Sequence, residues 1–299
     1  DSAAAERIAA GVAAGLAGGA SLPAGLLAEI ARRTDGVPLF VEELTKTMLE
    51  ARARPDLPDR VGAEASPASA ATLHDSLLAR LDRLGPVKTV AQTAAVIGGG
   101  FRRDLLAALT GMDAAALDAA LDRLVSAELV YPAADLGPQR LHLADPAEAA
   151  AFEFKHALVR DAAYESLLKS TRRGLHARLY RLLCDDPRTP PAVVARHAEA
   201  GALPVQAMAA WEKAGSVALA RPAYAEATAA FTAAIRVCRG FGDGVDNLRQ
   251  QLRLTNRLGL AQMGALGYQA EAVGGTFQSA LDLAERIGDA ELVFPAVFG

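Results

Sequence analysis

Apolar residues recur every three or four positions along most of this chain, which predicts helices separated by turns of glycine and proline. We expect a first helix to about Leu16, and a second from about Ser21 that ends at Gly36. Pro38 then begins a further helix that continues to Met48. From Arg52 to Ala71 no period remains, and the Pro, Asp, Ser and Ala content predicts a linker.

Helical patterns then resume and give way to two short strands. The strands are expected at Leu129 to Tyr131 and Phe152 to Phe154, on either side of a turn-rich insert from Pro132 to Ala150. Several helices followed by a two-stranded ribbon are typical of a winged helix, with the insert as its wing. The helices are predicted at Leu73 to Leu84, Val87 to Ile97, Arg102 to Leu109 and Ala114 to Ala127.

Beyond Ala157 the pattern is helical to the end. We expect breaks near Asp185 to Pro191, Gly201 to Pro204, Gly240 to Gly244 and Gly267. One stretch has the spacing of a tetratricopeptide repeat at five positions, which predicts one degenerate repeat without establishing a regular array. Those positions are Trp211, Gly215, Ala227, Phe231 and Ala234. A second pass anchored on Ala261, Phe277 and Ala280 fits only loosely, at a longer interval.

Composition narrows the function classes. The chain has 299 residues, 52% hydrophobic content and a formal net charge of −4, which predicts a folded protein without a general attraction for nucleic acid. Cys184 and Cys238 lie far apart outside any CxxC pair, so neither a disulfide framework nor a zinc cluster is expected, and a reducing cytoplasm is the predicted location. No long uncharged apolar run predicts a membrane span, and no membrane partner is expected.

One segment is locally basic. From Phe152 to Leu183, seven Lys or Arg residues stand against three acids. Such a surface can meet a phosphate, an acidic partner domain or DNA, or it is the solvated face of an amphipathic helix. The helix expected to enter a DNA groove carries Asp118 and Asp122 with only Arg123, so nucleic-acid binding by this chain is not expected.

The residues that catalysis needs are missing from the pattern. A phosphate-binding loop requires a Gly-Lys pair, and this chain contains none; the run Gly98 to Gly100 is interpreted as a helix end. The five histidines show no metal-ligand spacing, and no nucleophile motif occurs. We therefore expect no enzymatic activity, no metal and no cofactor in this chain.

Two motifs together resemble a known family. The stretch from Thr34 to Leu44 and the stretch from Phe154 to Leu168, with the helix from Leu73 to Leu84, are similar to the regulatory half of STAND-type signal-transduction ATPases. In the nearest relatives, an AAA-like NTPase is followed by a winged helix and tetratricopeptide-like helices. A class III adenylate cyclase domain often precedes this unit, or a LuxR-type DNA-binding domain follows it.

The resemblance implies a mainly α fold in four parts. These are a helical lid segment at 1–52, a linker at 53–71, a winged-helix domain with a small β-wing at 72–170, and tetratricopeptide-like helical hairpins at 171–299. The implied partners are an upstream NTPase domain and a signalling protein or ligand bound by the helical hairpins. ADP or ATP is expected in the intact parent protein only, bound by that NTPase domain.

The resemblance also implies roles for three residues. Gly36 and Pro38 match the GxP position, where the proline packs near the adenine; the alternative is a helix-starting proline after a glycine that ends the preceding helix. His156 matches the histidine that reaches the β-phosphate of ADP in an MHD-like motif; the alternative is a partly buried structural histidine capping its helix. Ala157 departs from the acidic residue of the stricter motif.

Three further functions stay open. The chain is a fragment of a LuxR-type transcription regulator that binds DNA, a stand-alone tetratricopeptide-like scaffold, or part of a class III adenylate cyclase polypeptide. The leading prediction is a non-catalytic regulatory and protein-interaction segment of a STAND ATPase, in which bound ADP favours a closed state. Whether the parent is an ATPase or a cyclase depends on residues outside this chain.

Overall fold

The protein is mainly helical, as the sequence predicts. A computed structural model describes residues 6–12, 77–133 and 151–288, together with seven single positions. Those positions are Pro23, Gly25, Leu27, Ala28, Ile30, Val41 and Thr45. The predicted linker at 53–71 and most of the predicted wing therefore lie outside the described residues, as do Gly36 and Pro38.

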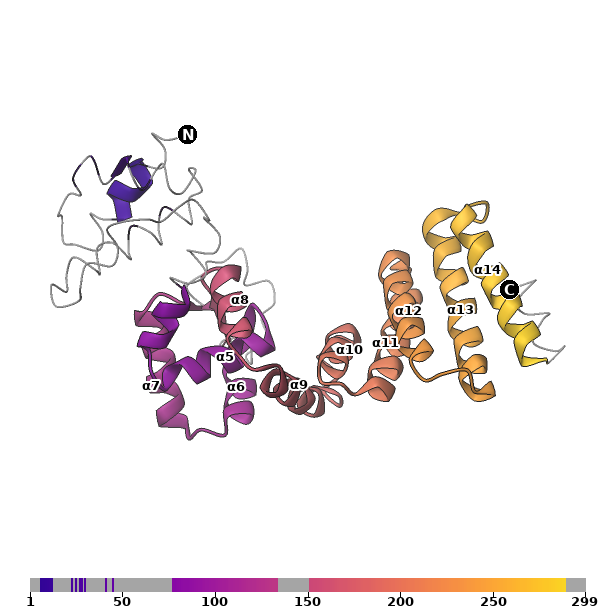
Figure 1. Cartoon of the computed structure of the whole chain (residues 1–299), viewed down its shortest axis with the longest axis horizontal. Helices are drawn as coiled ribbons and strands as arrows, with labels where there is room; N and C mark the ends of the chain where they lie inside the picture. Colours follow the sequence, from indigo (N-terminus) through magenta and orange to yellow (C-terminus); the bar gives the residue numbers. More distant parts are fainter. Residues whose placement is uncertain are drawn as a thin grey trace.

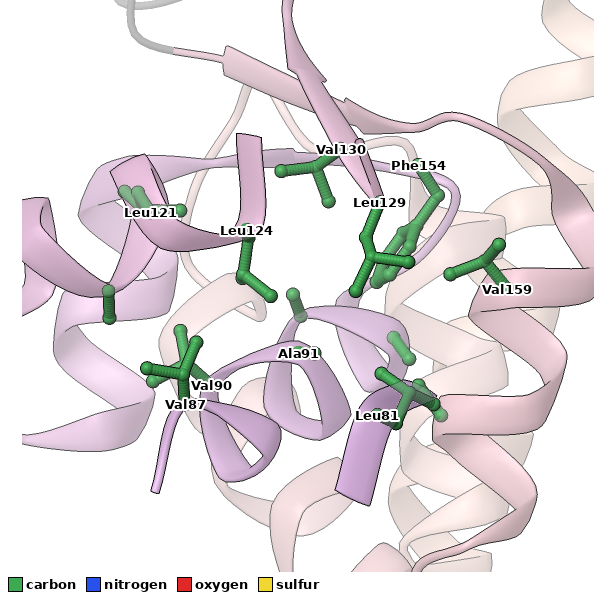
Figure 2. Packing of buried hydrophobic residues seen from close by; sticks show 14 of the residues in the cluster. Leu81, Val87, Val90, Ala91, Leu121, Leu124, Leu129, Val130, Phe154 and Val159 are labelled. Carbon is green, nitrogen blue, oxygen red and sulfur yellow. The ribbon is translucent and has the colours of Figure 1, made fainter. Parts of the chain in front are cut away.

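Residues 77–133 and 151–168 form a compact domain. Its helices pack on one side of a small antiparallel sheet (Figure 2), and residues 77–83 add one more helical stretch. The labelled elements, in chain order, are α5 (Val87–Ile97), β1 (Gly100–Arg102), α6 (Arg103–Thr110), α7 (Ala114–Ser126), β2 (Val130–Pro132), β3 (Ala151–Phe154) and α8 (Ala157–Glu165).

The sheet has one strand more than the sequence predicts. Its order is β1-β3-β2, so β3 pairs with both neighbours: Phe101 lies opposite Phe152, and Tyr131 lies opposite Glu153. The expected two-stranded ribbon was therefore wrong by one strand. β1 is three residues long and follows a glycine run, so it shows no alternation of its own and depends on pairing with a strand fifty residues away.

A continuous apolar core holds the compact domain together. Leu81, Leu121 and Leu124 come from helical segments and meet Leu129 and Phe154 beside the sheet (Figure 2). These side chains are at most 6% exposed. Phe101 stacks on Phe152 with ring centroids 5.8 Å apart, which fastens β1 to β3. Burial of Phe101 in this core therefore stabilises β1, the strand that the local sequence pattern does not predict.

The helix ends follow local chemistry closely. α5 has the predicted boundaries, and Gly98 follows it with a backbone φ of 153°. α7 begins after Asp113, whose carboxylate accepts the amide hydrogen of Ala116 at 2.9 Å, so Asp113 is an N-cap. α6 begins one residue later than predicted because Arg102 belongs to β1.

Residues 169–288 form a helical arm that extends away from the compact domain (Figure 1). Each helix packs against the next one in the chain, so the contacts of the arm are largely local. The helices are α9 (Lys169–Leu183), α10 (Pro191–Ala200), α11 (Pro204–Ala220), α12 (Tyr224–Arg239), α13 (Val245–Leu266) and α14 (Glu271–Ile287). The predicted breaks are all present, and the chain also turns at 221–223.

Glycines let the arm helices approach aromatic rings closely. A Cβ added at Gly215 of α11 would lie 2.7 Å from the ring of Phe231 on α12. A Cβ at Gly259 of α13 would lie 2.7 Å from the ring of Phe277 on α14. The same small-to-aromatic contact therefore occurs in two successive helix pairs, at an interval longer than 34 residues because α13 has 22 residues.

The arm is packed against the compact domain through its first two helices. Leu109 of α6 joins Leu179 and Leu183 of α9 and Val194 of α10 in one buried cluster. Arg178 also donates to the backbone oxygen of Ala108 at 3.4 Å. The junction between the compact domain and the arm therefore has its own apolar cluster. Charged side chains of the two parts, such as Arg102 and Asp186, also approach each other at this junction.

Candidate functional site

His156 lies at the start of α8, directly after β3. Its backbone is extended, with φ −141° and ψ 144°, and its carbonyl accepts from the amides of Val159 and Arg160 at 3.1 and 3.3 Å. The imidazole is half-buried, as the alternative of a partly buried structural histidine expects, but it makes no capping hydrogen bond, so the side-chain cap of that alternative is wrong. The backbone of His156, and not its ring, begins the helix.

Gly36 and Pro38 lie outside the described residues. Their predicted approach to the same nucleotide as His156 therefore stays a prediction. Among the described residues of the predicted lid segment, Ile30, Val41 and Thr45 are fully buried. Thr45 donates its hydroxyl hydrogen to the carbonyl of Val41 at 2.5 Å, as helical residues four positions apart can.

The basic segment is largely engaged within the protein. Lys155 pairs with Glu128 at 3.2 Å, and Arg160 pairs with Asp161 at 2.6 Å. Arg172 lies over the ring of Tyr164, 5.0 Å from its centroid. The segment is therefore not one continuous free basic face, and Arg160 is the member that reaches the cleft described below.

A cleft of about 660 Å³ opens between the compact domain and the first two arm helices. We call it the junction cleft. Its compact-domain side carries Arg102 and Arg160, and its arm side carries Arg188 and Arg196. No acidic residue lines it among the described residues. The other lining residues are Ile97, Gly98, Gly99, Gly100, Leu105, Tyr164, His176, Leu183, Thr189, Pro190, Val193, His197 and Ala200.

Carboxylates that do not line the cleft hold two more of these arginines in place, as Asp161 does for Arg160. Asp104 accepts two hydrogen bonds from Arg102, which lowers the pKa of that carboxyl. Asp186 accepts from Arg188 at 3.0 and 3.1 Å, and this pair lowers the pKa of Asp186. Asp186 also lies 3.8 Å from Arg102, so one carboxylate links the two sides of the cleft. Two-pronged pairs of this kind fix the plane of a guanidinium.

Arg196 differs from the other three. It is exposed on α10 and forms no ion pair with any residue in the described parts of the chain. Its positive charge contributes to lowering the pKa of the neighbouring His197. The wall of the cleft therefore keeps one guanidinium whose charge no described carboxylate neutralises.

Two buried histidines form the back of the cleft. The Nδ1 atoms of His176 and His197 lie 2.9 Å apart, and the hydroxyl of Tyr164 lies 3.0 Å from Nε2 of His176. The histidines are 7% and 8% exposed. Burial lowers the pKa of His197 from 6.5 to about 4, with smaller contributions from His176 and Arg196. Burial and nearby Arg172 lower the pKa of His176. Both rings are therefore neutral at pH 7.

This site was missed by reasoning from the sequence. His176 and His197 are 21 positions apart on different helices, a spacing that has no local meaning. Helix packing, and not spacing along the sequence, therefore brings the two histidines together. The pair has no third ligand, since no group of three His, Cys, Asp or Glu residues suited to a metal occurs within the described ranges. The one available signal was Arg188 and Arg196 flanking a helix-starting Pro-Pro pair.

The remaining expectations concern cysteines and membranes. Cys184 and Cys238 are both free thiols. Burial raises the pKa of Cys238, whose thiol donates to the side-chain oxygen of Asn247 at 2.9 Å. Among the helices that the structure describes, none has the length and apolar content to cross a membrane.

Comparison with known proteins identifies one relative of this chain. No protein-family model matches it, and no solved structure does. An uncharacterized protein of Rhizobium meliloti (strain 1021) is 26% identical to it over 275 residues, which cover 90% of this chain and 26% of the relative. The chain thus spans about a quarter of the length of the curated relative it matches. The name of that relative assigns no activity.

Proposed function

We propose that this chain is a non-catalytic regulatory and protein-interaction part of a STAND-type signal-transduction ATPase. It would close over a nucleotide that an upstream NTPase domain holds, and the helical arm would receive a signalling protein or ligand. The observation that carries the proposal is the element order of the compact domain together with the position of His156 between β3 and α8.

The compact domain supports the winged-helix part of this proposal. Its order is helix, strand, two helices, strand, insert, strand, and its sheet order is β1-β3-β2. A winged helix needs such a sheet at one end of a three-helix core, with the insert between the last two strands as the wing. His156 then heads the helix that follows the last strand, where backbone amides and the helix dipole favour an anion.

The arm supports the protein-interaction part. Helices that pack mainly on their neighbours in the chain give an extended surface, which is how repeat proteins bind partners. The contact of Gly215 with Phe231 lies at two of the positions that carry the tetratricopeptide spacing. The contact of Gly259 with Phe277 is its counterpart in the next helix pair.

The length of the relative also agrees with this proposal. A chain that aligns with only 26% of a relative is expected to work beside other domains in a polypeptide of that kind. A cytoplasmic location belongs to the proposal, because both cysteines are free thiols, as reduced compartments maintain them.

DNA binding is the less favoured alternative. Helix α7, which would enter the groove, exposes Asp118 and Asp122. Arg103 binds Asp118 at 2.6 Å, and Arg123 donates to the carbonyl of Leu84 at 3.2 Å, so the arginines near this face already have partners. A face of this charge repels phosphates. The scaffold and adenylate cyclase alternatives differ from the proposal in the domains that accompany this chain in the full-length protein. They make no different claim about the residues of the chain itself.

Nucleotide retention in the full-length protein tests the proposal. The protein is purified without added nucleotide, denatured, and its ADP content is measured by chromatography. We expect close to one ADP per protein, and a marked loss in the His156→Leu variant, because the diphosphate would lose a donor. Leu158→Gln, an exposed change on the same helix, serves as the control and should retain ADP.

Two results would overturn the proposal. One is a full-length protein that neither copurifies with ADP nor binds it in titration. The other is a His156→Leu variant that folds, as judged by circular dichroism, and retains as much ADP as the wild type. A salt-dependent shift of random duplex DNA by the 1–299 chain would instead favour the transcription-regulator alternative.

A further inference from the structure

The junction cleft has the charge pattern of an anion site. Four arginines line it, and the carboxylates that pair with three of them are not among its lining residues. These carboxylates are Asp104, Asp161 and Asp186. Asp161 accepts from Nε and Nη2 of Arg160. A guanidinium has five N–H groups, so Arg160 keeps donors for a ligand although it is held by a carboxylate.

Arg196 supplies a positive charge that no described carboxylate balances. Each of the other three arginines pairs with at least one carboxylate, whereas Arg196 has no acidic partner in the described parts of the chain. A site with one excess cation and fixed neighbouring guanidinium groups attracts and orients an anion, because the positive groups are positioned before the ligand arrives.

His197 adds a polar group directed at the cleft. Its side chain is 8% exposed, and its Nδ1 atom is engaged with His176. No residue that the structure describes forms a hydrogen bond with its Nε2 atom. This ring nitrogen is therefore available for a hydrogen bond with water or with a ligand in the cleft.

The rest of the wall is apolar and large enough for an organic molecule. Ile97 and Leu105 lie on the compact-domain side, and Leu183 and Val193 lie on the arm side. A volume of about 660 Å³ is within the range of small-molecule pockets. The combination of an apolar wall with several convergent cations is typical of a site for a small molecule, rather than for a flat macromolecular surface.

We propose that the junction cleft binds a small organic anion, through phosphate or carboxylate oxygens held by Arg160 and Arg196, with the body of the molecule on the apolar wall. Arg160 belongs to the compact domain and Arg196 to the arm, so one bound anion contacts both parts. Its binding stabilises the junction in the conformation seen here and couples ligand concentration to the position of the arm.

This site is separate from the proposed nucleotide contact. His156 does not line the junction cleft, and Arg196 is on the first helix pair of the arm. The two proposals can therefore fail independently. Loss of ADP on changing His156 bears on the ATPase proposal, whereas loss of anion binding on changing Arg196 bears on the cleft.

Isothermal titration calorimetry of the 1–299 chain with pyrophosphate, and separately with citrate, tests the site. The ionic strength is held constant with sodium chloride so that general screening does not change. We expect saturable binding of one anion per chain. Arg196→Gln and Arg160→Gln should each weaken it by about tenfold or more, because a charge-assisted hydrogen bond is lost.

Arg181→Gln is the matched control. Arg181 is an exposed arginine on α9 that does not line the cleft, so its removal makes the same change in net charge. Circular dichroism of each variant establishes that the helices persist. We expect Arg181→Gln to bind within about twofold of the wild type. Tighter binding of pyrophosphate than of citrate assigns the site to phosphates, and the reverse order assigns it to carboxylates.

Nuclear magnetic resonance provides a second measurement. The ring proton signals of His197 should move on addition of the anion, and those of His156 should not. The proposal is overturned if neither anion produces saturable heat, or if Arg181→Gln reduces binding as much as Arg196→Gln does. It is equally overturned if binding persists in both cleft variants.

Discussion

His176 and His197 share a hydrogen bond between their two Nδ1 atoms, 2.9 Å apart, with the rings stacked at a centroid separation of 5.2 Å. Only one proton fits between two ring nitrogens at this distance, so one ring donates and the other accepts. If the Tyr164 hydroxyl donates to Nε2 of His176, then Nδ1 of His176 carries the shared proton; in the reverse order, His197 carries it. In either arrangement, burial favours the neutral form of both rings because it lowers their pKa values.

This pair predicts a loss of stability in mild acid. The pKa of His197 is about 4 in the folded protein and 6.5 in the unfolded chain. Between these values the unfolded chain binds more protons, so the free energy of unfolding falls as the pH decreases from about 6.5 to about 4, and this contribution is constant above 6.5. The loss is on the order of 2–3 kcal/mol.

Urea unfolding at pH 7.5 and pH 5 in wild type and His197→Gln measures this effect. Other groups titrate in both proteins, so the difference between the two isolates the histidine. Arg172 and Arg196 stay charged throughout and disfavour protonation of the pair. The wild type should lose more stability than the variant on acidification. Equal losses would show that the pair does not resist protonation.

The close approach of Gly215 to Phe231 predicts that the addition of a single methyl group at Gly215 destabilises the protein. Gly215→Ala places a carbon 2.7 Å from a ring that is fully buried, so α11 and α12 must separate. We expect a destabilisation of about 1–3 kcal/mol. Trp211 is the one tryptophan of the chain and lies one turn before Gly215, so its fluorescence reports this unfolding.

Gly274→Ala is the control for that change. Gly274 also lies inside a helix, but an added Cβ there meets nothing within 4 Å. Alanine has the higher helix propensity, so this variant should gain about 0.5–1 kcal/mol. Opposite signs for the two glycines are the expected result. A neutral or stabilising Gly215→Ala would mean that the helix pair is looser than described.

Replacement of Leu124 tests how much the apolar core contributes to the stability of the compact domain. Its side chain is fully buried beside Ala91 and Leu129 (Figure 2). Leu124→Ala should cost about 2–5 kcal/mol through lost burial and the cavity left behind. Leu168→Ala, at a position 73% exposed, should change stability by less than about 0.5 kcal/mol. Thermal unfolding followed by far-ultraviolet circular dichroism compares the two; similar midpoints would contradict the assignment of the core.

Much of the fold could be read from the chain because its signals are local. Gly98 and the apolar spacing before it placed α5 at its observed boundaries, and Asp113 marks the start of α7. β1 could not be found in this way, because three residues carry no periodicity and the strand exists only by pairing with β3. The candidate site was harder still. Of the four cleft arginines, only Arg160 lies within the segment that the sequence marked as basic.

The sequence by itself determined the helical class, many element boundaries, four of the five turns between arm helices and the absence of a Gly-Lys phosphate loop, since each depends on neighbours within a few positions. The tertiary structure alone decided the third strand, the meeting of His176 with His197 and the arginines that face each other across the junction. These depend on how two helices pack against a separate domain. Packing geometry arises from many weak contacts between residues far apart in the chain, and no local pattern records it.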